Sequence, residues 1–331
     1  MENFEFTKAS TVQDALAATR SASSAQKLVR FVAGGTTLID LMKLNVERPT
    51  TVIDINSLPL DRVGATADGG LKIGAMVRNS DLAHDPSVQK NYAVLSEALL
   101  SGASPQLRNM ATTGGNILQR TRCYYFRDTA YACNKRDPGS GCSAIDGYNR
   151  IHAVLGGSQH CIATHPSDMA VAMTALEAIV HVEGPAGERT IPLNEFYLLP
   201  GDTPDRENVL RPGEIITYVT LPPLSDGTRS HYLKRRDRQS YEFALASAAV
   251  VIRLQGRKIQ RVRIALGGVG TRPWRSLEAE HALEGHEASE ANFRNAAQAA
   301  MRSAKPRQHN GFKIELARRT LLRALTTATT A

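Results

Sequence analysis

The sequence lacks the features that mark disordered, membrane-spanning and exported proteins. It contains no low-complexity tract, and its 42% apolar and 22% charged residues are typical of a globular chain that can bury a core. The longest apolar stretch, from Phe243 to Leu254, contains Arg253 and is shorter than the ~20 residues that a membrane helix requires. Residues 1–6 show no basic region followed by an apolar stretch, so we expect no secretory signal and no membrane span.

Motifs for hydrolysis and for nucleic-acid recognition are also absent. The chain has neither a serine nucleophile elbow with His and Asp partners nor an H-E-x-x-H helix, so nothing supports hydrolytic chemistry. Its formal charge of +8 comes mostly from scattered Lys and Arg, and no helix-turn-helix or zinc finger accompanies the densest basic group, Lys234–Arg236. Because net charge alone affects solubility and steering, we expect no nucleic-acid partner.

What the chain does contain is a succession of strand and helix patterns. Its length of 331 residues predicts two or three domains. Apolar periodicity predicts strands over 28–33 and 51–55, helices over 38–44, 92–100 and 169–176, a strand-rich part from His231, and a helix over 312–328. Ser167 and Asp168 are typical helix-start residues. The prolines at 222–223 and the turn at 225–227 indicate a domain boundary near residue 225.

Two glycine-rich loops stand where a phosphate could bind. Gly34–Thr37 lies between a predicted strand and a predicted helix, and Thr112–Asn116 follows closely behind Arg108. Backbone N–H groups at a helix start attract anions, and glycine allows close approach. Either loop alone could be an ordinary tight turn, but two of them favour a large anionic, dinucleotide-like ligand. No G-x-G-x-x-G follows the first strand, so this is not the Rossmann fingerprint.

The four cysteines are confined to one stretch of the chain. Cys123, Cys133, Cys142 and Cys161 lie within residues 119–161, called here the cysteine segment, where Gly, Pro, Asp, Asn and Arg dominate and periodicity fails. Four thiolates match the ligands of a [4Fe–4S] cluster. Structural zinc lacks its usual C-x₂₋₄-C pairs here, and disulfides need an oxidising compartment. From spacing alone, metal ligation, disulfides and unrelated cysteines all remain open.

Three histidines lie near the last cysteine. His152, His160 and His165 raise the alternative of a mixed Cys/His metal site. Each lies in polar sequence, and no pair has the i, i+4 spacing of two ligands on one helix face. We therefore expect them to be solvated loop residues.

Three segments together resemble the FAD-binding subunits of the xanthine dehydrogenase and aldehyde oxidase family, the molybdenum hydroxylases. They are Arg30–Leu38 (RFVAGGTTL), Thr112–Asn116 (TTGGN) and His165–Asp168 (HPSD). The resemblance covers essentially the whole chain. It is closest to the periplasmic aldehyde oxidoreductase members, whose FAD subunit carries four cysteines between TTGGN and the later Ser-Asp.

The resemblance implies a fold and a set of domains. The fold class is α+β, with two α/β FAD-binding subdomains of the PCMH/VAO type and a C-terminal domain of sheet and helices. The first subdomain would span 1–57, and the second would span 58–224 with a cysteine-rich cluster insertion at 119–162. A domain like that of carbon monoxide dehydrogenase flavoproteins would span 225–331.

The resemblance also implies which residues hold the cofactors. Arg30, Phe31, Val32, Ala33, Gly34, Gly35, Thr36, Thr37 and Leu38 would line the FAD pyrophosphate. Thr113, Gly115 and Asn116 would approach the isoalloxazine and phosphate region, Asp168 would bond the cofactor, and Lys234 would come from the C-terminal domain. Cys123, Cys133, Cys142 and Cys161 would ligate a [4Fe–4S] cluster.

The implied role is electron transfer, with no catalytic residue in this chain. An aldehyde would be oxidised in a large molybdopterin-binding subunit. Electrons would pass through a small [2Fe–2S] subunit to FAD in this chain, and then to an external acceptor. The heterotrimer would be periplasmic by co-export with a signal-bearing partner, or cytoplasmic.

Two alternatives belong to other functional classes. In a β subunit of a 4-hydroxybenzoyl-CoA reductase-like complex, electrons would run towards the molybdenum. A zinc- or disulfide-stabilised interaction module would carry no redox cofactor. Colour distinguishes the interaction module from the two flavin hypotheses, because flavin and iron–sulfur proteins absorb visible light.

Overall fold

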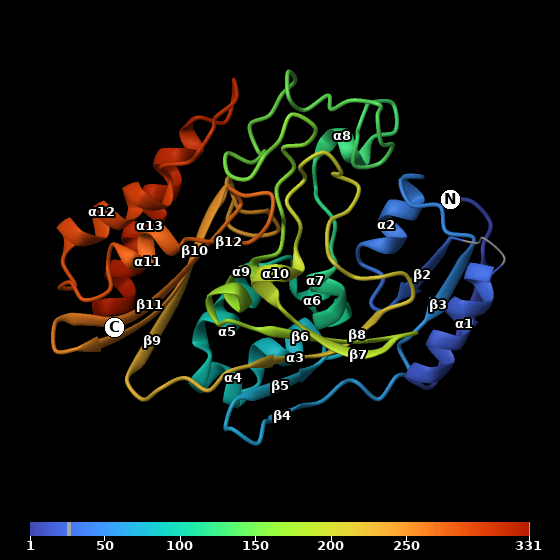
Figure 1. Ribbon diagram of the computed structural model, residues 1–331, viewed down its shortest axis with the longest axis horizontal. Helices are drawn as coiled ribbons and strands as arrows, with labels where there is room; N and C mark the ends of the chain where they lie inside the picture. The colour runs from blue at the N-terminus through green and yellow to red at the C-terminus, as the bar shows by residue number, and fades with distance from the viewer. Residues whose placement is uncertain (25–27, 331) are drawn as a thin grey trace.

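The computed structural model describes residues 1–24 and 28–330, and its strands form three sheets (Figure 1). The first sheet is parallel, in the order β1-β3-β2, with β1 (Glu5–Lys8), β2 (Val29–Val32) and β3 (Thr51–Asp54). Parallel strands need crossover connections, and α1 (Val12–Ser24) and α2 (Leu38–Lys43) lie in them. Ile53 is fully buried, in a core that this small unit shares with Met76 and Ile215 of the part that follows.

The second sheet is antiparallel and lies at the centre of the molecule. Its strand order is β4-β5-β8-β6-β7, with β4 (Val63–Ala65), β5 (Leu71–Gly74), β6 (Ile179–Gly184), β7 (Gly187–Pro192) and β8 (Ile215–Leu221). Its helices are α3 (Asn79–His84), α4 (Pro86–Asn91), α5 (Ala93–Ser101), α6 (Pro105–Met110), α7 (Thr113–Ile117), α9 (Asp168–Ala175) and α10 (Leu193–Phe196).

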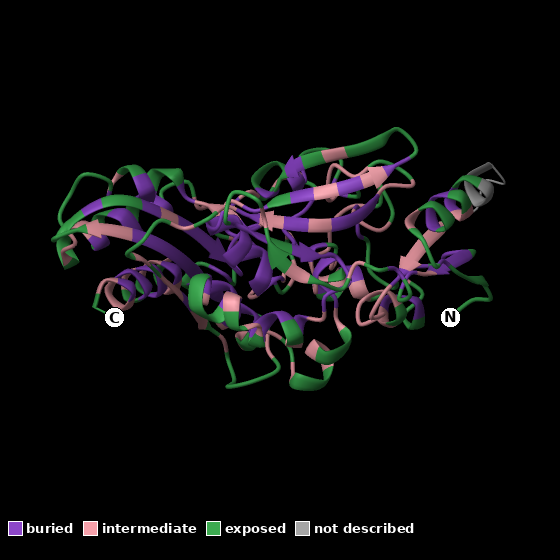
Figure 2. Ribbon diagram, turned by 90° about the horizontal axis from the view of Figure 1, so that it is seen from below, coloured by how far each residue is buried: buried purple, intermediate pink, exposed green. Residues whose placement is uncertain are grey.

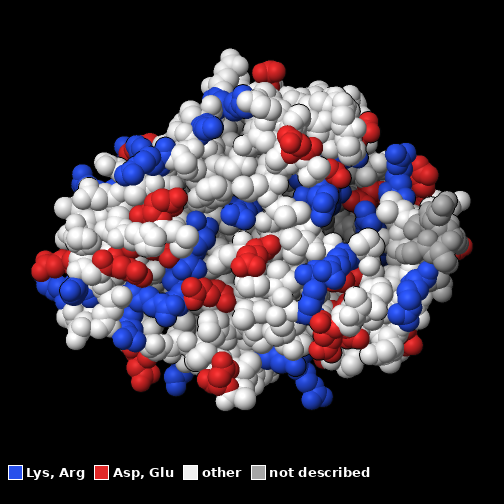
Figure 3. All heavy atoms as spheres, viewed as in Figure 1, with Lys and Arg blue, Asp and Glu red and all other residues white. Residues whose placement is uncertain are grey.

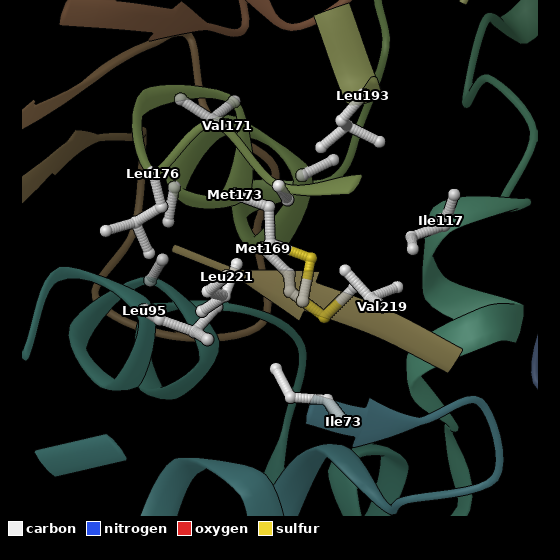
Figure 4. Packing of buried hydrophobic residues seen from close by; sticks show 14 of the residues in the cluster. Ile73, Leu95, Ile117, Met169, Val171, Met173, Leu176, Leu193, Val219 and Leu221 are labelled. Atoms are coloured by element: carbon white, nitrogen blue, oxygen red, sulfur yellow. The ribbon is translucent and has the colours of Figure 1, made fainter. Parts of the chain in front are cut away.

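Helix α9 is the centre of this core. All its residues are buried, and Met169 and Met173 pack in one cluster with Leu95 of α5 and Val219 of β8 (Figure 4). A helix that is apolar on every side belongs in a core. Its first turn is fixed by Ser167, whose hydroxyl accepts from the N–H of Ala170 at 2.9 Å. The helix start predicted from Ser167 and Asp168 is thereby confirmed.

The third sheet carries the C-terminal helices. Its order is β12-β11-β10-β9, with β9 (Thr228–Arg235), β10 (Ala246–Gln255), β11 (Lys258–Gly267) and β12 (Trp274–Arg275), followed by α11 (Leu277–His281), α12 (Glu290–Ala300) and α13 (Phe312–Thr330). Strand β10 is buried on both faces: Val251 joins the central core, whereas Val250 and Ile252 join the core under α12 and α13. Tyr232 of β9 and Ala265 of β11 also join the central core, so the C-terminal sheet packs against the rest of the molecule through several strands.

The cysteine segment contrasts with these sheets. Within the described chain, its only helix is the single turn α8 (Tyr124–Arg127), and isolated bridges join Cys133 to Cys142 and Leu155 to Gly270. It forms the loops drawn at the top of Figure 1 around α8. The lack of periodicity predicted an irregular structure for this segment, and this prediction is confirmed.

The elements predicted from periodicity are present, with ends shifted by a residue or two. The predicted helices over 38–44 and 92–100 correspond to α2 and α5, and that over 312–328 to α13. Buried residues run through the sheet interiors, while loops and outer helix faces are exposed (Figure 2). Acidic and basic side chains are interspersed on the face seen in Figure 3. Among the described residues, no helix has both the length and the apolarity to cross a membrane.

Candidate cofactor site

A cavity of about 1550 Å³, called here the central cavity, lies where the three parts of the molecule meet. Its wall includes Gly34 from the loop after β2, Asn116 from α7, Asp168 from the start of α9, and Gly267 from the end of β11. Typical small-molecule sites occupy ~300–1,000 Å³. The central cavity therefore has room for a cofactor as large as a dinucleotide.

Close backbone packing brings the two glycine-rich loops to this cavity together. A Cβ on Gly34 would lie 1.9 Å from the carbonyl oxygen of Met110, just before the second loop. Gly35 has a φ of +71°, a conformation that favours glycine. In the second loop, the Thr112 hydroxyl accepts from the N–H of Gly115 at 3.3 Å and caps α7. Glycine is thus required where the first loop packs on the second.

The first loop presents backbone donors for which the described part of the chain offers no acceptor. Among the described residues, none accepts a hydrogen bond from the N–H groups of residues 34–37. These residues line the central cavity immediately before α2. A run of free N–H groups at a helix start is the arrangement that binds phosphate oxygens. The residues present therefore fit an anionic, pyrophosphate-bearing ligand.

A chain of ion pairs connects the central cavity to the cysteine segment. Arg30 donates to Glu47 at 3.0 Å, and Arg120 pairs with both Glu47 and Glu207. Lys135, in the cysteine segment, donates to Glu207 at 3.1 Å. Burial alone would raise the pKa of Glu207, but Lys135 and Arg120 lower it below its usual value. Glu207 is therefore a charged residue that holds two separate parts of the chain together.

A second ion pair, almost wholly buried, joins α9 to the C-terminal sheet. Lys234 of β9 donates to Asp168 Oδ2 at 2.7 Å, and Tyr232 donates its hydroxyl to Asp168 Oδ1 at 2.6 Å. Lys234 also donates to the carbonyl of Ser101 at 3.1 Å. The pair stands at the edge of the central cavity, which Asp168 lines and Lys234 does not. Both carboxylate oxygens of Asp168 are thus engaged by protein donors.

The four cysteines converge on one small cavity beneath the loops of the cysteine segment. Cys123, Cys133, Cys142 and Cys161 all line it, and all four are free thiols. Burial raises the pKa of the Cys123 thiol to about 12 and that of Cys161 to about 11. Over residues 1–24 and 28–330, no group of three or more His, Cys, Asp and Glu side chains could hold a metal ion as placed.

The histidines correct one prediction. His152 is buried rather than solvated, with 1% of its surface exposed and its Nε2 3.0 Å from Cys123 Sγ. His165 is half-buried against the ring of Tyr197, and burial lowers the pKa of both histidines to about 4. Only His160 is exposed. The polar sequence around these histidines predicted exposure to solvent wrongly, because the loops that carry them fold inward onto the thiols.

Most of the residues predicted to bind the cofactor line the central cavity. Those that line it are Arg30, Phe31, Ala33, Gly34, Gly35, Thr36, Thr37, Leu38, Gly115, Asn116 and Asp168. Val32, Thr113 and Lys234 do not, and the Thr113 hydroxyl instead donates to the carbonyl of Val77 at 3.2 Å. Direct contact of any of these side chains with FAD stays a prediction.

Several charged residues of the wall had no role predicted from sequence. Arg122 and Arg127 donate to Asp40 of α2 at 3.2 and 2.8 Å, and all three line the central cavity. The hydrogen bond from Arg127 holds the pKa of Asp40 below its usual value. Arg122 stands next to Cys123 in the sequence. That adjacency was the available signal that the cysteine segment also helps to wall the central cavity.

Comparisons with known proteins agree with this architecture. Residues 2–224 match the family of the FAD binding domain in molybdopterin dehydrogenase, and residues 231–328 match the carbon monoxide dehydrogenase flavoprotein C-terminal domain. The chain is 52% identical over 328 residues to the aldehyde oxidoreductase FAD-binding subunit PaoB of Escherichia coli K12, covering 97% of this chain and 98% of that one.

More distant relatives share the fold over the full length. The carbon monoxide dehydrogenase medium chain of Hydrogenophaga pseudoflava is 29% identical over 330 residues, covering 98% of this chain and 96% of that one. A solved structure of carbon monoxide dehydrogenase from that organism superposes with a TM-score of 0.78 and covers 99% of this chain and 98% of that one. The chain therefore belongs to the FAD-binding family of the molybdopterin dehydrogenases, with an FAD-binding domain followed by a flavoprotein C-terminal domain.

Proposed function

We propose that this chain is the FAD- and [4Fe–4S]-carrying subunit of a molybdenum-dependent aldehyde oxidoreductase. It takes electrons from a small [2Fe–2S] subunit and passes them to an external acceptor. The observation that carries the proposal is the joining of two sites. A glycine-walled cavity with free N–H donors is connected by an ion-pair chain to a pocket lined by all four cysteines. The identity to an aldehyde oxidoreductase FAD-binding subunit supports the substrate class.

In this proposal the FAD pyrophosphate is held by the loop of residues 34–37. Its free N–H groups supply donors, and the close contact of Gly34 with Met110 keeps the loop in place. Gly115 and Asn116 of the second loop also line the cavity, as does Asp168, which Lys234 fixes. Bound FAD supplies two-electron chemistry with release of electrons singly or together, and the protein binds and orients it.

The cluster proposal assigns Cys123, Cys133, Cys142 and Cys161 as ligands. The four thiols meet in one pocket, although among the described residues no three His, Cys, Asp or Glu side chains are placed to hold a single metal ion. Ligation requires thiolates, and burial raises the pKa of the Cys123 and Cys161 thiols. Incorporation therefore releases protons and couples to the folding of the loops. A [4Fe–4S] cluster supplies one-electron transfer there.

The proposed partners carry out the steps that this chain does not perform. The aldehyde is oxidised in a large molybdopterin-binding subunit, so no residue here acts as a general acid or base. Residues of the cysteine segment and of the central cavity wall position the two cofactors relative to each other. The complex is a heterotrimer, located in the periplasm through a signal-bearing partner or in the cytoplasm.

The test is a cofactor analysis of the co-purified complex. Per copy of this chain, we expect one flavin, and iron and acid-labile sulfide in excess of the [2Fe–2S] content by ~4 each. Aldehyde added without air should bleach the flavin absorption. A complex in which flavin is stoichiometric but the excess iron is absent would remove the cluster and leave the flavin role. A colourless complex would remove both.

A further inference from the structure

His152 occupies an unusual position beside the first cysteine. Its ring is buried, its Nε2 lies 3.0 Å from Cys123 Sγ, and its Nδ1 has no partner among the described residues. The ring also lies 6.1 Å, centroid to centroid, from Tyr125. Burying an imidazole with one nitrogen unpaired is unfavourable unless the other nitrogen makes a strong bond. Among the residues that the structure describes, Cys123 makes the one polar contact with this side chain.

The chemistry of the sulfur decides the direction of this bond. A thiolate has no proton to donate, so a Cys123 that holds iron can only accept. Nε2 must then carry the hydrogen, and the neutral ring leaves a bare lone pair on the unpartnered Nδ1. The observed geometry thus matches an N–H donor to a thiolate with a fixed tautomer.

The backbone of His152 is held from the C-terminal domain. Lys313 of α13 is fully buried and donates to the carbonyls of Ile151 and His152, both at 2.9 Å, and to that of Gly268 at 2.6 Å. Asn310 also donates to the His152 carbonyl, at 3.4 Å. Burial lowers the pKa of Lys313 to about 7, but three carbonyl acceptors call for the three protons of the ammonium form. Because Gly268 lines the central cavity, Lys313 connects the His152 backbone with the cavity wall.

From this geometry we infer that His152 is a positioning residue that donates its Nε2–H to the Cys123 thiolate and raises the reduction potential of the cluster, with Lys313 holding it in register. The inference rests on the cluster proposed above. Reduction adds negative charge to the cluster and its sulfur ligands. A donor to the sulfur therefore stabilises the reduced state more than the oxidised one.

The experiment is a redox titration of the complete complex, followed by EPR, with three variants. His152→Phe keeps a ring and removes the donor. His152→Gln places an amide N–H near the position of Nε2. His309→Phe is the matched control, because His309 is exposed on the loop before α13, where its ring lies 5.4 Å, centroid to centroid, from Tyr148 and its backbone N–H donates to Asn149 at 3.0 Å.

We expect His152→Phe to make reduction of this cluster roughly tenfold less favourable, which for one electron is ~59 mV more negative. His152→Gln should recover most of the shift, and His309→Phe should show none. A His152→Phe complex with full iron and an unchanged potential would overturn the inference while leaving the cluster in place. Wild-type complex without the extra iron and sulfide would instead overturn the proposed function.

Should His152→Phe fail to assemble, the wild-type complex and His152→Gln still decide. Pulsed EPR of the reduced cluster with ¹⁵N-labelled histidine should show a nitrogen coupling in the wild type that disappears in His152→Gln. The [2Fe–2S] signals, titrated separately, should be the same in both. A wild-type cluster without any difference from His152→Gln in nitrogen coupling would overturn the inference.

Discussion

The central cavity and the cysteine segment hold their backbones in different ways. The cavity wall is built from the ends of β2, α2, α7 and α9, whose backbone groups are satisfied mainly by sheet ladders and helix bonds. In the cysteine segment, the backbone hydrogen bonds of turns are supplemented by side chains: Arg136 donates to the carbonyls of Tyr125 and Phe126, both at 2.8 Å. One site is thus a product of regular structure, and the other depends on specific donors.

The two regions also differ in which interactions offset the conformational entropy that their backbones lose on folding. Fixing a backbone costs ~1–2 kcal/mol per residue in conformational entropy. Around the central cavity, the large core of α5, α9 and the central sheet offsets that cost. The cluster of buried residues around the thiols is small, with Phe126, Leu41 and Ile162 as its larger members. The cysteine segment should therefore depend on its ligand more strongly than the cavity wall depends on FAD.

The largest effect should follow Cys133→Ser. This change removes one proposed ligand, so we expect the excess iron to fall from ~4 per chain to near zero. Proteolysis should then cut faster within 119–161, while most of the flavin stays bound. Iron analysis and limited proteolysis with peptide mapping measure both. Asp146→Asn, exposed in the same segment, is the control and should change neither. Equal loss of flavin and iron would erase the distinction between the two regions.

Thr36→Asp tests the other region. It places a carboxylate in the loop whose free N–H groups are proposed to hold the pyrophosphate. Two charges ~4 Å apart at an effective dielectric of ~20 interact by ~4 kcal/mol, which is about a thousandfold in affinity. Flavin retained after gel filtration is the measurement, and Thr36→Asn is the neutral control. Equal flavin content in both variants would move the pyrophosphate elsewhere.

The features that the sequence predicted correctly belong mainly to the region of regular structure. Periodicity located α2, α5 and α13, and the glycine pattern identified both loops that line the central cavity. The likeness to a known family supplied the fold class and the FAD role, which the comparisons bear out. These are local signals, or signals carried by the whole chain.

What the sequence did not predict depends on distant contacts. The partners Arg120 and Glu207 stand 87 positions apart, and Lys313 and His152 stand 161 apart. No local pattern relates such residues, so their burial and pairing emerge only when the chain is folded. His152 was predicted to be solvated for this reason. Thr113 was assigned to the cofactor by the family resemblance; its hydroxyl donates to the carbonyl of Val77, and its contact with FAD stays a prediction.

Lys234→Met sharpens the comparison by weakening the regular region. Removing one partner of a buried pair leaves Asp168 uncompensated, and we expect a loss of about 3 kcal/mol in the free energy of unfolding. The double variant with Asp168→Asn should recover part of this loss, because no unpaired charge remains. Thermal unfolding of the complex measures both. A Lys234→Met complex as stable as wild type would show that Tyr232 alone satisfies Asp168.

Glu207→Gln should have the smallest effect, and its pH dependence makes it diagnostic. Glu207 has a pKa below its unfolded value of 4.5 because Lys135 and Arg120 outweigh the cost of burial. Its contribution is therefore complete above pH 4.5 and is lost as the pH falls through the lower, folded pKa. At pH 7 we expect the variant to lose about 1–2 kcal/mol, the scale of hydrogen bonds to a charged group. The difference in melting temperature between the wild type and the variant should close as the pH falls below 4.5.

Glu290→Gln is the control, because its i, i+4 pair with Arg294 is exposed and should contribute almost nothing. A gap that widens on acidification would mean that Glu207 is not the anion that links the cysteine segment to the central cavity.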